Sequence, residues 1–146
     1  MEIIIGEENV NLGDGGQITG EIYFKINDYY FPERRWNDFF VTILQWWVHN
    51  YITAIRSNSY TFEFHFMDGP YSVKAVLIEK NLYEIRLLMT NENNNTEIVT
   101  THVCPKELQD MLIKACKRAF KVLWLAEIPS DKAVGLKSLY EELKKL

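Results

Sequence analysis

Two pairs of acidic and imidazole side chains are the residues of this sequence best suited to move a proton. Glu63 and His65 alternate along one predicted strand, and Glu84 and His102 occupy neighbouring positions on two later strands. A carboxylate beside an imidazole is an arrangement that general acid–base catalysis uses. The sequence offers neither pair a third orienting group, and most such pairs are surface ion pairs. We therefore predict no catalytic residue, and keep a small enzyme built on either pair as the less favoured alternative.

The cysteines and histidines do not form a metal-binding motif. The two cysteines do not make a Cys-x-x-Cys pair, and the three histidines belong to three different predicted elements. Cys104 precedes Pro105 at the start of a predicted helix, but the sequence places no base beside its thiol. We predict no metal and no cofactor.

Alternating apolar residues predict the strands that position the first acid–imidazole pair. Three phenylalanines from Phe62 to Phe66 alternate with Glu63 and His65, and a second alternating run follows the turn at residues 68–70. When both apolar sets share one face, Glu63 lies opposite Lys74 on the other face.

Two more alternating runs extend this polar face. The runs 82–90 and 97–103 continue a meander, so Arg86 follows Lys74 in the same row and His102 lies beside Glu84. The candidate binding residues on this face are Glu63, His65, Lys74, Arg86 and His102.

Aromatic side chains supply a second set of candidates. Phe, Trp and Tyr make up 14% of the chain, more than one helix–sheet interface needs. Aromatic residues left at a surface often mark protein contacts. Tyr29, Tyr30 and Trp46 are therefore predicted to contribute to a partner surface or pocket.

The patterns together predict a single α+β domain over residues 1–146. A long hydrophobic helix at 33–56 has only one narrow polar line, so other elements must cover most of it. It packs against an antiparallel meander sheet of about five to six strands, which the strand Ile18–Asn27 joins at one edge. Two C-terminal helices, one at 105–126 and one after Ser130, complete the domain.

Composition and charge exclude several classes of function. The 146 residues are 47% hydrophobic and 25% charged, which is typical of a folded globular domain. The net charge of −4 argues against nucleic-acid binding, and the basic line Lys114–Lys121 is interpreted as a solvated helix face. Free cysteines, with no signal segment and no membrane span, favour the cytoplasm.

Three segments carry a family resemblance. Pro-Glu-Arg-Arg-Trp-Asn-Asp-Phe-Phe at 32–40, the pair Trp46–Trp47 and Phe-Met-Asp-Gly-Pro-Tyr at 66–71 are similar to segments of small bacterial proteins thought to be immunity proteins. Such proteins neutralise a secreted toxin domain by covering its active site. The resemblance covers about half of the chain and transfers no functional residue. It implies a protein partner, a toxin domain.

The favoured hypothesis is a non-catalytic cytoplasmic module that binds a protein, an immunity protein against a toxin. Acidic side chains would speed its docking onto a basic partner. The acidic positions expected to be exposed are Glu7, Glu8, Asp14, Glu92, Glu97, Glu141 and Glu142. The alternative is a small-ligand-binding domain with an apolar cavity between the sheet and the first helix.

Overall fold

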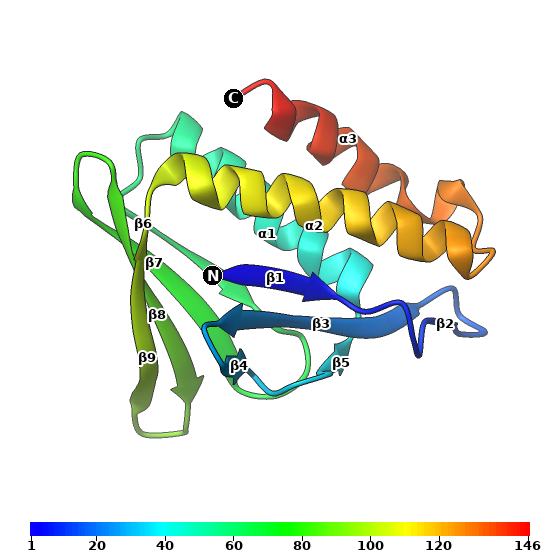
Figure 1. Cartoon of the computed structure of the whole chain (residues 1–146), viewed down its shortest axis with the longest axis horizontal. Helices are drawn as coiled ribbons and strands as arrows, with labels where there is room; N and C mark the ends of the chain where they lie inside the picture. The colour runs from blue at the N-terminus through cyan, green and yellow to red at the C-terminus, as the bar shows by residue number, and fades with distance from the viewer.

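The computed structural model describes the backbone of residues 1–146 and all side chains except that of Asn95. Over this chain the strands form two antiparallel sheets, one of five strands and one of four, with three helices beside them. Figure 1 shows the four-stranded sheet at one end of the molecule and the five-stranded sheet below the helices. The predicted α+β class is confirmed.

The five-stranded sheet is built around one long strand, β3. Its members are β1 (Glu2–Ile5), β2 (Asn11–Leu12), β3 (Ile18–Ile26), β4 (Tyr29–Phe31) and β5 (Asn37–Asp38). Gly6 N–H donates to the Glu21 carbonyl at 3.1 Å, and Ile22 N–H donates to the Trp36 carbonyl at 2.9 Å. Because successive residues of a strand point their main-chain groups to opposite sides, β1 and β5 lie on opposite sides of β3.

The prediction of one sheet that includes the strand Ile18–Asn27 is wrong. Both edges of β3 are occupied by short strands close to it in sequence, so no edge is left for the meander. These partner strands are two to four residues long, too short to produce a clear alternating pattern.

The predicted four-strand meander is confirmed. Its strands are β6 (Thr61–His65), β7 (Tyr71–Glu79), β8 (Leu82–Thr90) and β9 (Asn95–Val103), paired in the order β6-β7-β8-β9. Glu63 lies opposite Lys74, Lys74 opposite Arg86, and Glu84 opposite His102. Phe66 N–H donates to the Tyr71 carbonyl at 3.1 Å and closes the first turn. The hydrophobic alternation therefore determines the register, apart from a bulge on β7 between Leu77 and Glu79 and one on β9 near Arg86.

The first helix, α1 (Phe40–Arg56), begins seven residues later than the predicted segment 33–56. Asn37 and Asp38 pair instead with Glu21 and Gly20 of β3. The buried Asp38 carboxylate accepts the N–H of Phe39 at 2.7 Å, and the helix starts at the next residue. The expectation of a central helix is confirmed, since α1 contacts β3, β6 and both later helices.

Aromatic rings fill the space between α1 and the two sheets. Trp47 stacks on Phe24 with ring centroids 5.0 Å apart and on Phe64 at 5.5 Å. Phe66 meets Trp47 edge-on at 5.2 Å. The rings occupy the place where the alternative hypothesis expected a ligand cavity.

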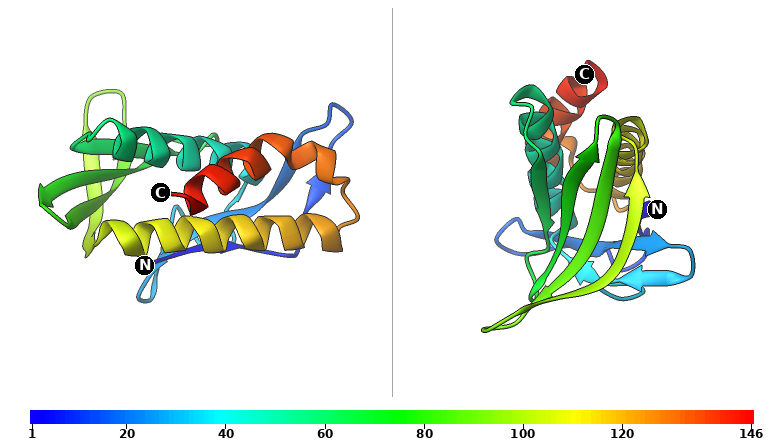
Figure 2. Two further views of the ribbon diagram at one scale, coloured as in Figure 1. Left: turned by 90° about the horizontal axis from the view of Figure 1, so that it is seen from above. Right: turned by 90° about the vertical axis from the view of Figure 1, so that its left-hand side faces the viewer.

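Two further helices cover the other side of α1. They are α2 (Pro105–Leu125) and α3 (Val134–Lys144), joined through the 3-10 turn Ser130–Ala133. Figure 2 shows α3 running obliquely between α1 and α2 when the molecule is seen from above. Among the described residues, no helix is both long and apolar enough to cross a bilayer.

Candidate functional site

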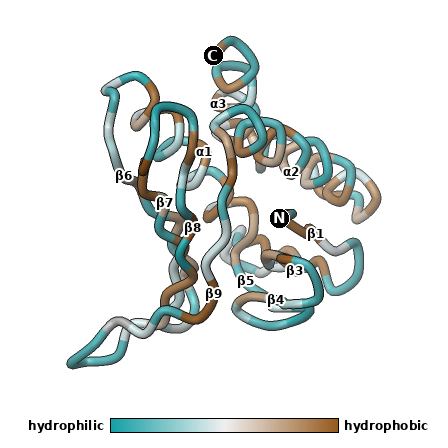
Figure 3. The backbone as a smooth tube through the Cα atoms, turned by 60° about the vertical axis from the view of Figure 1, so that its left-hand side comes forward, coloured by the Kyte–Doolittle hydropathy of each residue, from teal (hydrophilic) through white to brown (hydrophobic). Residues whose placement is uncertain are grey.

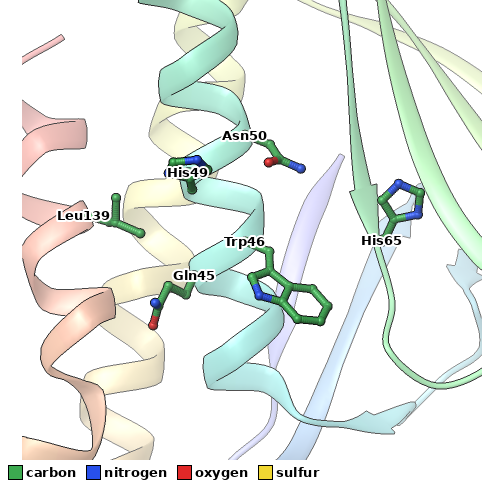
Figure 4. A pocket seen from close by; sticks show the side chains of 6 residues that line it. All are labelled: Gln45, Trp46, His49, Asn50, His65 and Leu139. Atoms are coloured by element: carbon green, nitrogen blue, oxygen red, sulfur yellow. The ribbon is translucent and has the colours of Figure 1, made fainter.

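A pocket of about 400 Å³ opens on the outer side of α1. Figure 4 shows α1 in its centre, Leu139 of α3 on one side and His65 of β6 on the other. We call this surface the α1 face, and its residues are Gln45, Trp46, His49, Asn50, His65 and Leu139. It brings together two residues predicted from the sequence, Trp46 and His65.

Two hydrogen bonds fix the distance between α1 and β6. Trp47 Nε1–H donates to the His65 carbonyl and Asn50 Nδ2–H donates to the Glu63 carbonyl, both at 2.8 Å. The bond from Phe66 N–H to the Tyr71 carbonyl means that the even-numbered residues of β6 form the hydrogen bonds to β7. The carbonyls of Glu63 and His65 therefore point away from β7. Side chains of α1 therefore cover the free edge of β6, which positions His65 beside the helix.

The predicted Glu63–His65 pair is formed. His65 Nε2 lies 3.0 Å from Glu63 Oε2, and the two side chains are 57% and 35% exposed. Ser72, opposite His65 on β7, is buried. An imidazole so open to water forms a screened surface pair. The geometry supports hydrogen bonding to a partner better than proton transfer in a closed site.

Trp46 is the aromatic residue that the α1 face exposes. Its side chain is 42% exposed, whereas the next residue, Trp47, is fully buried. Gln45, His49 and Asn50 line the same pocket with groups that both donate and accept hydrogen bonds. The face therefore combines one large apolar surface with uncharged polar groups.

The remaining predicted sheet residues lie away from this face. Lys74, Arg86 and His102 belong to β7, β8 and β9, further from α1 than β6. Arg86 Nε donates to Glu84 Oε1 at 2.6 Å, and His102 Nε2 is 3.9 Å from the other oxygen of Glu84. Glu84 is thus engaged mainly by arginine, which weakens the case for a Glu84–His102 acid–base pair.

The two predicted tyrosines belong to the five-stranded sheet. Tyr29, the first residue of β4, is 38% exposed. Tyr30 packs edge-on against Tyr23 at 5.9 Å, with the Arg34 guanidinium 5.6 Å from its ring centre. They do not join Trp46 on the α1 face.

Four residues of the α1 face were not predicted. Gln45 and His49 lie four residues apart on the polar line of the helix. This spacing alone places them on the same side of the helix and could have predicted them as neighbours. Asn50 and Leu139 become part of the site only through the packing of β6 and α3 against α1. Within the described residues, no three metal-ligating side chains come close enough to hold an ion.

Most of the predicted acidic positions have a basic neighbour. Glu7 pairs with Arg118, Glu8 with Arg35, Glu97 with Arg86, Glu142 with Arg56, and Glu141 with Lys144. Such pairing shortens the reach of the carboxylate field. Steering of a basic partner therefore has less support from the structure than the net charge suggests.

No family model, curated protein or solved structure matches this chain. The resemblance to immunity proteins thus rests on the three sequence segments alone.

Proposed function

We propose that this chain is a non-catalytic, cytoplasmic protein-binding module that contacts its partner through the α1 face. The observation that carries the proposal is the exposed indole of Trp46 in a pocket lined mostly by polar side chains. Partly exposed tryptophans are enriched at the energetic centres of protein interfaces, where a polar rim excludes water around them.

The polar groups of the face suit a protein partner. The Gln45 and Asn50 carboxamides and the His49 imidazole each donate and accept, as the amides of a partner's main chain require. The Asn50 carboxamide is already oriented by its bond to the Glu63 carbonyl. Binding therefore costs less side-chain entropy at this position.

A toxin domain is the partner that the sequence resemblance favours. Trp46 lies in one of the three segments that carry the resemblance, and it is also the exposed anchor of the α1 face. Such an inhibitor acts by covering the active site of its partner. It needs a preformed binding surface for this, and no catalytic residues. The product of the adjacent gene is the first partner to test.

Photo-cross-linking from position 46 tests the proposal. A benzoylphenylalanine at Trp46 should capture a protein in the source cells, whereas the same group at Trp124, a 76% exposed indole at the end of α2, should not. With the captured protein purified, Trp46→Ala should weaken binding by roughly thirtyfold in calorimetry. Trp124→Ala is the matched control and should change the Kd by less than about twofold. Equal losses in the two variants would contradict the α1 face as the interface.

A small ligand is the second candidate for the same surface. The pocket volume of about 400 Å³ lies within the range of small-molecule sites. In that case, when a panel of metabolites is screened, at least one compound should raise the Tm of the wild type but not that of Trp46→Ala. A Trp46-dependent ligand with no cross-linked protein would favour this alternative.

A further inference from the structure

A second surface lies between β1 and α2, on the opposite side of the helices from the α1 face. The groove has a volume of about 720 Å³, and residues 1–5 form one wall. The other wall consists of Glu107, Asp110, Met111, Lys114, Lys117, Arg118 and Lys121 of α2. Both Figure 1 and the left view of Figure 2 show β1 and α2 side by side and nearly parallel.

β1 presents an open edge to this groove. In the described chain it pairs with β3 alone. The bond from Gly6 N–H to the Glu21 carbonyl means that the even-numbered residues of β1 form the hydrogen bonds to β3. The main-chain groups of Glu2 and Ile4 therefore face β3, and those of Ile3 and Ile5 point outward. Arg118 Nε donates to the Ile5 carbonyl at 3.2 Å. Among the described residues, both main-chain groups of Ile3 and the N–H of Ile5 have no hydrogen-bond partner.

This edge contrasts with that of β6. The outward carbonyls of Glu63 and His65 are both satisfied by side chains of α1. Protein folds cover or charge exposed strand edges because such edges bind other chains. On β1, α2 packs against the strand itself, and the groove of about 720 Å³ runs along the edge beside the flank of the helix. Figure 3 shows the apolar β1 strand and, next to it, the mixed polar and apolar turns of α2.

The basic side chains of α2 define the chemistry of the occupant. Lys114, Lys117, Arg118 and Lys121 recur at spacings of three and four, so they share one side of the helix. The ion pairs of this helix are Lys106–Asp110 and Arg118–Glu7, and among the described side chains the three groove lysines form none. The row therefore offers three positive charges to a ligand.

The spacing of these charges matches an extended peptide. Lys117 and Lys121 are separated by about 6 Å along the helix axis. Alternate side chains of a strand, which point to the same face, are about 7 Å apart. Two carboxylates placed at alternate positions of an added strand would thus meet successive lysines.

We propose that the β1–α2 groove binds an acidic, extended segment of a protein partner, which adds as a strand to the edge of β1. Its main chain pairs with Ile3 and Ile5, and its alternate carboxylates pair with the lysines of α2. The carboxylates of Glu107 and Asp110 lie at the other end of the groove, so the acidic part of the segment sits at the Ile5 end. A second copy of this chain is disfavoured, because each copy would bring its own basic row to the interface. This inference does not depend on the function proposed for the α1 face.

A short model peptide tests the inference on the full chain. The probe is acetylated Val-Glu-Val-Glu-Val-Glu amide, titrated to about 1 mM while amide hydrogen exchange is followed by NMR. We expect the amides of Ile3 and Ile5 to become protected on binding. Ile4, already paired with Tyr23, and the edge strand β9 should not change.

Variants and altered probes separate strand addition from simple charge attraction. The double variant Lys117→Glu/Lys121→Glu should weaken the peptide roughly tenfold or more. Lys80→Glu/Lys145→Glu has the same charge change at exposed positions outside the groove and should bind as the wild type does. N-methylation of the peptide amides that face β1 should abolish binding, and the lysine analogue Val-Lys-Val-Lys-Val-Lys should not bind.

Three results would overturn the proposal. The first is binding that leaves the exchange of Ile3 and Ile5 unchanged, which would indicate a plain anion-binding helix face. The second is tighter binding of a short uridylate oligonucleotide than of the peptide, which would indicate a nucleic-acid surface. The third is no binding of the acidic peptide at about 1 mM.

Discussion

The buried indole of Trp47 donates a hydrogen bond to the main-chain carbonyl of His65 at 2.8 Å, while the His65 side chain is exposed on the candidate site. One turn further along α1, Asn50 makes the same kind of bond to Glu63. A helix therefore occupies the place of a neighbouring strand at the β6 edge. The position of the exposed histidine is consequently set by the core.

The first prediction concerns this hydrogen bond. Trp47→Phe removes the indole N–H and part of a fully buried side chain, and leaves the His65 carbonyl without its donor. We expect the free energy of unfolding in urea to fall by about 2–4 kcal/mol. Trp124→Phe, at a 76% exposed indole, should change it by less than about 0.5 kcal/mol. A similar small loss in both variants would show that the bond contributes little.

The second prediction concerns the face of the four-stranded sheet that packs on α1. Phe64 is 1% exposed and lies 5.5 Å from Trp47 between ring centres. Phe64→Ala should therefore lower the free energy of unfolding by about 3–5 kcal/mol. Thr61→Ala, on the same strand but exposed, is the control. A loss below about 1 kcal/mol for Phe64→Ala would contradict the packing described here.

Alternation along residues 60–103 was sufficient to predict the meander and its register outside the bulges. Each run places apolar side chains on one face, and a slip by one residue would expose all of them. The same reasoning correctly placed Glu63 opposite Lys74 and Glu84 opposite His102. Local pattern is a reliable guide here, because each strand pairs with its neighbour in sequence.

The division into two sheets and the start of α1 could not be predicted in this way. Both depend on residues 29–38, where two short strands return to β3 before the helix begins. Asp38 has the helical spacing of the polar line on α1, yet its carboxylate is buried between three segments. Likewise, Asn50 joins the candidate site only because β6 packs beside it. Such contacts between distant segments leave no periodic trace in the sequence.

The third prediction concerns Asp38. Its carboxylate accepts the main-chain N–H of Phe39 at 2.7 Å, of Met67 at 3.2 Å and of Asp68 at 3.1 Å. Trp36 Nε1–H is a fourth donor, at 3.2 Å. Asp38→Ala leaves these donors without an acceptor and should lower the free energy of unfolding by about 3–5 kcal/mol.

The matched control for Asp38 is an exposed aspartate in a loop. Asp14→Ala should change the free energy of unfolding by less than about 0.5 kcal/mol. Backbone amide exchange at Met67 should also accelerate in Asp38→Ala and not in the control. Unchanged exchange at that amide would contradict the role assigned to the carboxylate.

The last prediction is a loss of stability in alkali caused by Cys116. Burial raises the pKa of its thiol from 9.0 to about 12, so the folded protein keeps the proton while the unfolded chain releases it. Stability from this group is complete below the unfolded pKa and is lost as the pH rises toward the folded pKa. Between about pH 9 and 10 the free energy of unfolding should fall by about 1 kcal/mol on this account. Burial also raises the pKa of Tyr51, but from 10.0, so its contribution is lost mainly at higher pH. Urea titrations at these pH values should show that the free energy of unfolding falls less with rising pH in Cys116→Ala than in the wild type. An equal fall in both proteins would contradict the buried, protonated thiol.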